Sequence, residues 1–109
     1  MSETTIFENA CSDAGLFACD YGTDEMRVYR HDDVTIANGT PCFRHGAAPL
    51  FKGSRDDAAR FVYDSAARNL RELAKAMLPD VMEAARAIGF AQRYDGYAAS
   101  KTSASTLRL

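Results

Sequence analysis

The segment Ser54–Leu78 carries an amphipathic pattern that is compatible with little other than a long helix. At about 100° per residue its apolar side chains form one stripe: Ala59, Val62, Tyr63, Ala66, Leu70, Leu73 and Met77. Charges of alternating sign occupy the opposite side at i,i+4 spacing: Asp56, Arg60, Asp64, Arg68 and Glu72. A Ser-x-x-Asp capping pattern opens the segment and Pro79 follows it, which bounds the helix at both ends. We therefore predict a long helix here, with Leu70 and Leu73 in the core.

The chain before this helix has the pattern of a short antiparallel meander. Residues 4–12 predict a short helix that Gly15 ends, and residues 16–19 and 26–31 predict strands. Asn38-Gly39 lies between two β-prone runs and predicts a hairpin over Val34–Arg44, because a type I′ turn needs positive φ at both central residues.

The remaining segments are predicted from the glycine and proline residues that interrupt regular secondary structure. Gly46–Gly53 is predicted as a loop, and Pro79 as the first residue of a second, shorter helix that runs to about Ile88 and is ended by Gly89. Residues 98–109 are small and polar and predict a flexible tail after a single domain over residues 1–97. The expected fold class is α+β: a small antiparallel meander of two to four strands, with one long and one shorter helix packed on one face.

Charge is unevenly placed along the chain. The 109 residues are 47% hydrophobic and 26% charged with a net charge of −2, which is globular and argues against a general nucleic-acid-binding protein. Residues 1–50 carry eight acids and three basic residues, whereas residues 51–109 carry ten basic residues and seven acids. Such a bipolar chain suits a charged protein partner, or two halves that face each other in the fold.

Composition also indicates the cellular compartment. Three cysteines without a secretory signal pattern predict free thiols in a reducing, cytoplasmic setting. No run approaches the ~20 apolar residues of a membrane span, so we expect no membrane partner. The sequence leaves the oligomeric state open.

The one C-x-x-H pattern is Cys42-Phe43-Arg44-His45. With Cys11 and Cys19 it could supply four zinc ligands, but the spacing matches no zinc knuckle or ribbon. We therefore expect no metal, no cofactor and no catalytic residue. A thiol- or metal-dependent small enzyme that uses Cys42 and His45 is the alternative hypothesis.

Two groups of residues are candidates for partner binding. Phe61 lies about 150° from the centre of the apolar stripe, beside Arg68 and Glu72, so it is either covered by the same chain, for example by Ile6 and Phe7, or offered to a partner. The second group combines aromatic rings with an arginine, as binding hot spots do: Phe90, Arg93, Tyr94 and Tyr97. The helix face around Phe61 is favoured, because a rigid helix loses less entropy on binding than a mobile tail.

The order of these elements resembles a known class of small proteins. A hairpin over Val34–Arg44, then Pro49-Leu50-Phe51, then a helix that begins Ser54-x-x-Asp57-Ala58-Ala59, is similar to the layout of some phage- and plasmid-borne anti-CRISPR proteins. The resemblance covers about residues 26–88, in arrangement only. It implies a non-enzymatic inhibitor that binds a subunit of a CRISPR effector complex, and it assigns no role to a particular residue.

The function expected from the sequence is thus a non-enzymatic protein-binding module. A nucleic-acid-associated accessory protein is a further alternative, in which a basic face would be formed by Arg60, Arg68, Arg71, Arg86 and Arg93. The interleaved acids oppose that interpretation.

Overall fold

The computed structural model describes residues 2–22, 24–77 and 80–107 of the chain. Helix α1 (Glu3–Ala14) begins at Ser2, whose hydroxyl accepts a hydrogen bond from the amide of Thr5 at 3.1 Å. It ends at Gly15, which has φ 67°, a left-handed conformation that glycine adopts without steric cost. Gly15 therefore ends the helix as predicted and leads directly into the first strand.

Strand β2 (Met26–Arg30) is the centre of an antiparallel sheet with the order β1-β2-β5. Strand β1 (Leu16–Asp20) pairs with it along its whole length. The third strand, β5 (Phe51–Gly53), lies within the segment predicted as a loop, and it pairs Phe51 with Val28. A three-residue strand is too short to show an alternating pattern in the sequence, which is why it was missed.

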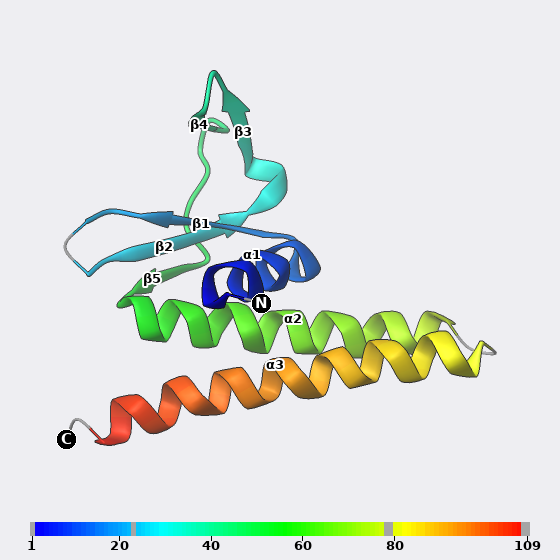
Figure 1. Cartoon of the computed structure of the whole chain (residues 1–109). Helices are drawn as coiled ribbons and strands as arrows, with labels where there is room; N and C mark the ends of the chain where they lie inside the picture. Colours follow the sequence, from blue (N-terminus) through cyan, green and yellow to red (C-terminus); the bar gives the residue numbers. More distant parts are fainter. Residues whose placement is uncertain (1, 23, 78–79, 108–109) are drawn as a thin grey trace.

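The predicted hairpin is confirmed. A 3₁₀ turn, η1 (His31–Asp33), leads into β3 (Val34–Ala37), which pairs with β4 (Thr40–Phe43) as a separate two-stranded sheet. Figure 1 shows this sheet projecting away from the rest of the fold. We call residues 34–43 the arm.

Two long helices form the other half of the molecule. Helix α2 (Arg55–Met77) opens with Ser54, whose hydroxyl accepts the amide hydrogen of Asp57 at 3.2 Å, as the capping pattern predicted. Helix α3 (Val81–Leu107) is opened by Asp80, whose carboxylate accepts the amide hydrogen of Glu83 at 3.1 Å. The predicted role of Pro79 lies outside the described residues. Figure 1 shows α2 beneath the sheet and α1, with α3 running along α2, so the predicted α+β class is confirmed.

The second helix differs from its prediction in length. It was expected to end near Gly89 and be the shorter one, yet α3 has 27 residues and α2 has 23. Its buried side chains recur at steps of three and four residues, and this spacing continues past Gly89 and Gly96. They are Ala84, Ala87, Ala91, Tyr94 and Ala98. A continuous packing stripe of this kind outweighs the ~1 kcal/mol helix penalty of each glycine.

The segment predicted as a flexible tail is helical up to Leu107. Ala98 is buried, and the ammonium group of Lys101 pairs with Glu3 at 2.7 Å and with Asp56 at 3.8 Å. These contacts join α3 to α1 and α2. The packed domain therefore extends beyond residue 97, to at least Lys101.

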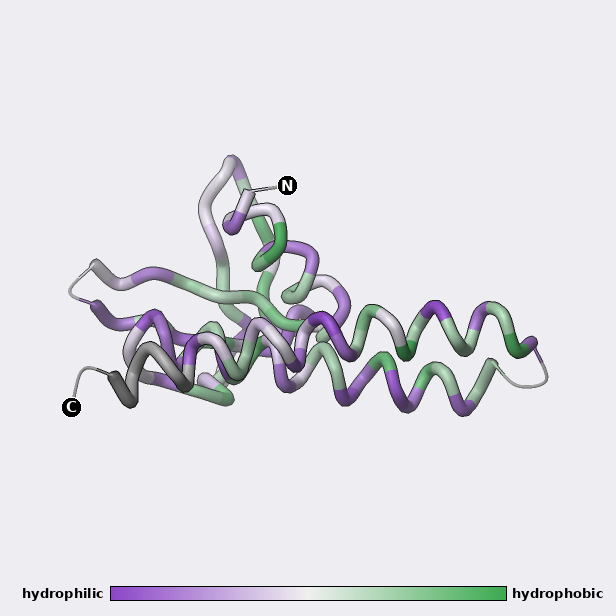
Figure 2. Tube along the Cα trace, turned by 60° about the horizontal axis from the view of Figure 1, so that its bottom comes forward, coloured by the Kyte–Doolittle hydropathy of each residue, from purple (hydrophilic) through white to green (hydrophobic). Residues whose placement is uncertain are grey.

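The core lies where the two long helices, α1 and the sheet meet, and it is rich in alanine. Small side chains along the α2–α3 contact allow the two helices to approach closely. Figure 2 shows apolar and polar bands alternating along both helices, as expected for helices that bury one face each.

Leu70 is buried as predicted, but the prediction for Leu73 is wrong, because 44% of its surface is exposed. Figures 1 and 2 show that α2 and α3 extend past the end of α1 and of the sheet. Leu73 lies on this projecting part, where only α3 covers α2 and the burying surface is narrower.

Candidate partner-binding surfaces

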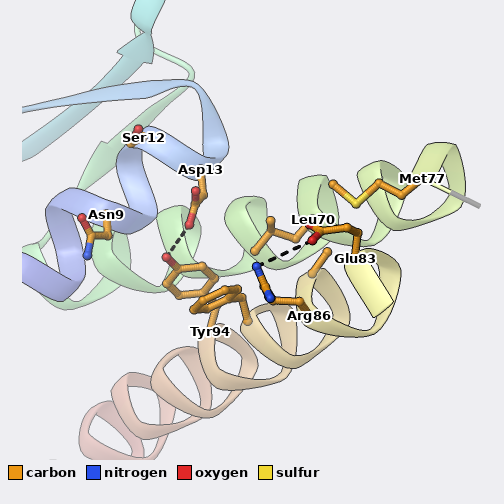
Figure 3. A pocket seen from close by; sticks show the side chains of 10 residues that line it. Asn9, Ser12, Asp13, Leu70, Met77, Glu83, Arg86 and Tyr94 are labelled. Carbon is orange, nitrogen blue, oxygen red and sulfur yellow. Dashed lines mark hydrogen bonds and ion pairs between the residues drawn. The ribbon is translucent and has the colours of Figure 1, made fainter. Parts of the chain in front are cut away.

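A groove lies where α1, α2 and α3 meet, at the point where α1 ends and the two long helices continue (Figure 3). It has a volume of about 390 Å³ and is lined by side chains of all three helices: Asn9, Ser12, Asp13, Leu70, Met77, Glu83, Arg86, Ala87, Phe90 and Tyr94. The lining combines apolar side chains, such as Leu70 and Ala87, with polar ones, such as Asn9 and Glu83. This combination is typical of surfaces that hold another molecule.

Tyr94 lines the groove and also helps to hold the helices together. The side chain is 6% exposed, and its hydroxyl donates a hydrogen bond to the carboxylate of Asp13 at 2.5 Å. The side-chain amide of Asn69 donates to the backbone carbonyl of Asp13 at 2.6 Å. Asp13 thus receives one hydrogen bond from α2 and one from α3 at the end of α1.

The environment of Tyr94 favours its neutral phenol. Burial, followed by the hydrogen bond to Asp13, raises the pKa of Tyr94 above its ordinary value. The neighbouring ring of Tyr63 stacks on Tyr94 with 6.1 Å between centroids, and burial raises the pKa of Tyr63 to about 12. Both phenols therefore keep their protons at neutral pH and act as core residues rather than as bases.

The other three members of the predicted aromatic group lie on the outer surface of α3. Phe90 is 44% exposed and Tyr97 is 36% exposed. The guanidinium carbon of Arg93 lies 5.5 Å from the centroid of the Phe90 ring, within the range of a cation–π contact. We call Phe90, Arg93 and Tyr97 the α3 ridge. It borders the groove through Phe90 and continues past Tyr94 along α1.

The other predicted surface, around Phe61, is separate from the ridge. Arg68 and Glu72 are exposed there, and Glu72 pairs with Lys75 at 3.1 Å. These positions lie on the side of α2 that is turned away from α3, since Tyr63 and Leu70 on the opposite side of the same helix are buried. The predicted residues therefore belong to two separate surfaces, apart from Tyr94, which is buried.

Phe61 itself is covered by the same chain. Its ring stacks on Phe51 of β5 with 5.1 Å between centroids and 19° between the ring planes. Ile6 and Phe7 were the expected cover, but Phe7 packs edge-on against Tyr63 instead. The entropic preference for the Phe61 face over a mobile tail also disappears, because Phe90 to Tyr97 are on a helix too.

The Phe51–Phe61 stack predicts a stability effect. Phe61→Ala is expected to cost about 1–3 kcal/mol of unfolding free energy, because it removes a half-buried ring and its stacking partner's contact. Arg68→Ala on the same helix face is the control and should change stability by less than about 0.5 kcal/mol. Chemical denaturation of both variants measures this, and equal small losses would show that the stack contributes nothing.

The residues of the alternative enzyme hypothesis lie on or beside the arm. Cys42 and His45 are both exposed, and the Cys42 thiol lies 3.8 Å from the carbonyl oxygen of Thr40. Burial, with a smaller effect of Glu8, raises the pKa of Cys11 to about 11, and burial also raises the pKa of Cys19. A raised pKa is the opposite of what a nucleophilic thiol requires, so neither Cys11 nor Cys19 suits that role. Over the described parts of the chain, no three His, Cys, Asp or Glu side chains gather as metal ligands do.

The arginines of the nucleic-acid hypothesis are largely engaged with carboxylates. Arg60 pairs with Asp57 at 3.8 Å, Arg86 pairs with Glu83 at 3.7 Å, and Arg71 forms an ion pair with Asp95. Each carboxylate offsets the charge that a phosphate would need to meet. The geometry gives this hypothesis no support.

Comparisons with known proteins identify no relative of the chain. No family model, no curated protein and no solved structure matches it. Among the helices of residues 2–77 and 80–107, none is both long enough and apolar enough to span a membrane. The function is therefore argued from the surfaces described above.

Proposed function

We propose that this protein is a non-enzymatic protein-binding module, and that the α3 ridge and the adjoining groove form its main contact surface. The observation that carries the proposal is the exposure of Phe90, at 44%, on a packed helix beside a groove of mixed apolar and polar lining. Aromatic residues and arginine that flank a pocket supply much of the energy of protein–protein contacts. Because α3 is already packed against α2, the ridge needs little ordering when a partner binds.

The charges around the groove indicate how a partner would be oriented. Glu83 and Arg86 form an ion pair at 3.7 Å on the rim, and both side chains are at least half exposed. A partner helix with an apolar face and flanking charges fits such a groove. Tyr94 is already buried within the fold, so only the ridge and the groove are available to the partner.

The layout resemblance described above supports a subunit of a CRISPR effector complex as the first partner to test, with the protein acting as its inhibitor. We place this activity in the cytoplasm, where free thiols persist; all three cysteines are free, which supports that placement.

The test replaces Phe90 with a photo-crosslinking amino acid in the native host, and places the same probe at exposed Tyr21 on the sheet as the control. Protein captured from Phe90 but not from Tyr21 identifies the partner. In binding measurements with that partner, Phe90→Ala and Arg93→Ala should each raise Kd about tenfold or more, whereas Tyr21→Ala should change it by less than about threefold. The proposal is wrong if both ridge variants bind as tightly as the parent protein.

A further inference from the structure

The two strands of the arm pair extensively only with each other among the described elements. Every residue of it except Val34 is exposed, and none of residues 34–43 is charged. Figure 1 shows its two strands standing clear of the three-stranded sheet and the helices. An isolated two-stranded hairpin is only marginally stable in water, so an uncharged arm of this kind gains from pairing with a further strand.

The pair at the base of the arm and its turn determine which residues form hydrogen bonds across the two strands. The amide of Arg44 donates to the carbonyl of Asp33 at 2.7 Å, so this pair takes a hydrogen-bonded position of the ladder. Hydrogen-bonded and non-hydrogen-bonded pairs alternate in an antiparallel ladder. In the observed register, the amide and carbonyl of Ile36 and the carbonyl of Val34 on β3 therefore point outward, as do the backbone groups of Pro41 and Phe43 on β4. The amide of Val34 is engaged, because it donates to the carbonyl of His31 in the 3₁₀ turn.

The two outer edges of the arm differ because of one residue. Ile36 presents an amide hydrogen and a carbonyl oxygen at the β3 edge. Pro41, its partner across the ladder, has no amide hydrogen to present at the β4 edge. The β3 edge is thus open to a further strand, and the β4 edge is blocked.

One face of the arm is apolar as well. Val34 lies opposite Phe43 and Ile36 lies opposite Pro41, and side chains of directly opposed residues share a face. Ile36 is 55% exposed, and Phe43, whose ring centroid lies 4.6 Å from that of Tyr29, is still 40% exposed.

We propose that β3 pairs with β3 of a second copy of this chain, antiparallel, with Thr35 on the two-fold axis. The Ile36 amide of each copy then donates to the Val34 carbonyl of the other, and the two apolar faces join on the same side of a continuous sheet. A second copy fits because an antiparallel strand is complementary to itself and the arm carries no charge that would repel its own kind. Pro41 at both outer edges ends the sheet, so the assembly closes as a dimer. This inference does not depend on the groove or the α3 ridge.

Sedimentation equilibrium of the purified full chain tests the proposal. A small contact predicts a weak dimer that forms with rising concentration. Ile36→Pro removes the outward amide without breaking a hydrogen bond within the arm, and should raise the dimer dissociation constant about tenfold or more. Ile36→Thr keeps the amide and should weaken the dimer less, whereas Pro41→Thr opens the second edge and should produce larger assemblies. A parent protein that remains monomeric up to about 1 mM, or an Ile36→Pro variant that dimerises equally well, would overturn it.

Cross-linking provides a second measurement that is independent of the proline variant. On the proposed axis the two Thr35 residues form a non-hydrogen-bonded pair, for which the Cα separation is about 4.5 Å, within the range of disulfides. Thr35→Cys combined with Cys42→Ser, treated with oxidised glutathione, should give a covalent dimer. Ala37→Cys with Cys42→Ser lies on the same face but off the axis, and should give much less. Equal yields from the two variants would contradict the proposed register.

Discussion

Replacing Tyr94 by alanine is expected to lower the unfolding free energy by about 3–5 kcal/mol. The ring is buried between α1, α2 and α3, stacks on Tyr63, and carries the hydroxyl that reaches Asp13. Truncation leaves a cavity where the three helices meet and leaves one carboxylate hydrogen bond unmade. A domain of this size is stable by only about 5–15 kcal/mol, so denaturant unfolding should show a large shift of the midpoint.

Tyr94→Phe separates the hydrogen bond from the ring. Because the acceptor is a carboxylate, its loss should cost about 1–3 kcal/mol, and the remainder of the alanine effect belongs to packing. Tyr97→Phe, at a ring that is 36% exposed, is the matched control and should cost less than about 0.5 kcal/mol. If Tyr94→Phe were as stable as the parent protein, the contact with Asp13 would contribute nothing. Binding experiments should therefore avoid Tyr94→Ala, whose effect on a partner would be confounded with unfolding.

The second large effect is expected at Leu70, in direct comparison with Leu73. Leu70→Ala should cost about 2–4 kcal/mol, because Leu70 is 8% exposed and packs in the α2–α3 core. Leu73→Ala removes the same atoms three residues along the same helix, but from a side chain that is 44% exposed, and should cost less than about 1 kcal/mol. Parallel denaturant titrations of the two variants measure the difference. Equal losses would mean that the projecting part of α2 is covered in solution, for example by a partner.

Local signals in the sequence were sufficient to predict the structure where a single residue type determines the backbone conformation. Asn38 and Gly39 have φ 53° and 78°, as a type I′ turn requires. Gly15 has the left-handed conformation that ends a helix. These positions could be predicted because the steric requirement is local and needs no knowledge of the packing.

The same residue type misled the prediction at Gly89. It was expected to end a helix, but α3 continues through it and through Gly96. The alanine stripe from Ala84 to Ala98 contained the information, since its three- and four-residue steps continue unbroken past both glycines. Whether a glycine ends a helix depends on what the following turn can bury.

The candidate site shows a similar division. The sequence pattern correctly placed Phe61 away from the main apolar stripe. It left two possibilities open, and coverage of the ring by the same chain was one of them. It could not identify Phe51 as the cover, because the contact depends on how β5 pairs with β2. Likewise, the pattern Phe90–Tyr97 did not distinguish buried Tyr94 from exposed Phe90, since that depends on where α1 lies. Contacts between segments far apart in sequence leave no mark on local periodicity.

The hydrogen bond between Asp13 and Tyr94 spans 81 positions of the chain, and this separation has a consequence for biosynthesis. At a translation rate of about 5–20 residues per second, α1 waits roughly 4–16 seconds for the helix that completes its environment. Ile6 and Phe7, which pack on the core in the finished fold, lack part of their cover during that time. Contacts of such long range also slow folding. The first helix of the nascent chain therefore remains exposed to chaperones and proteases until α3 has been made.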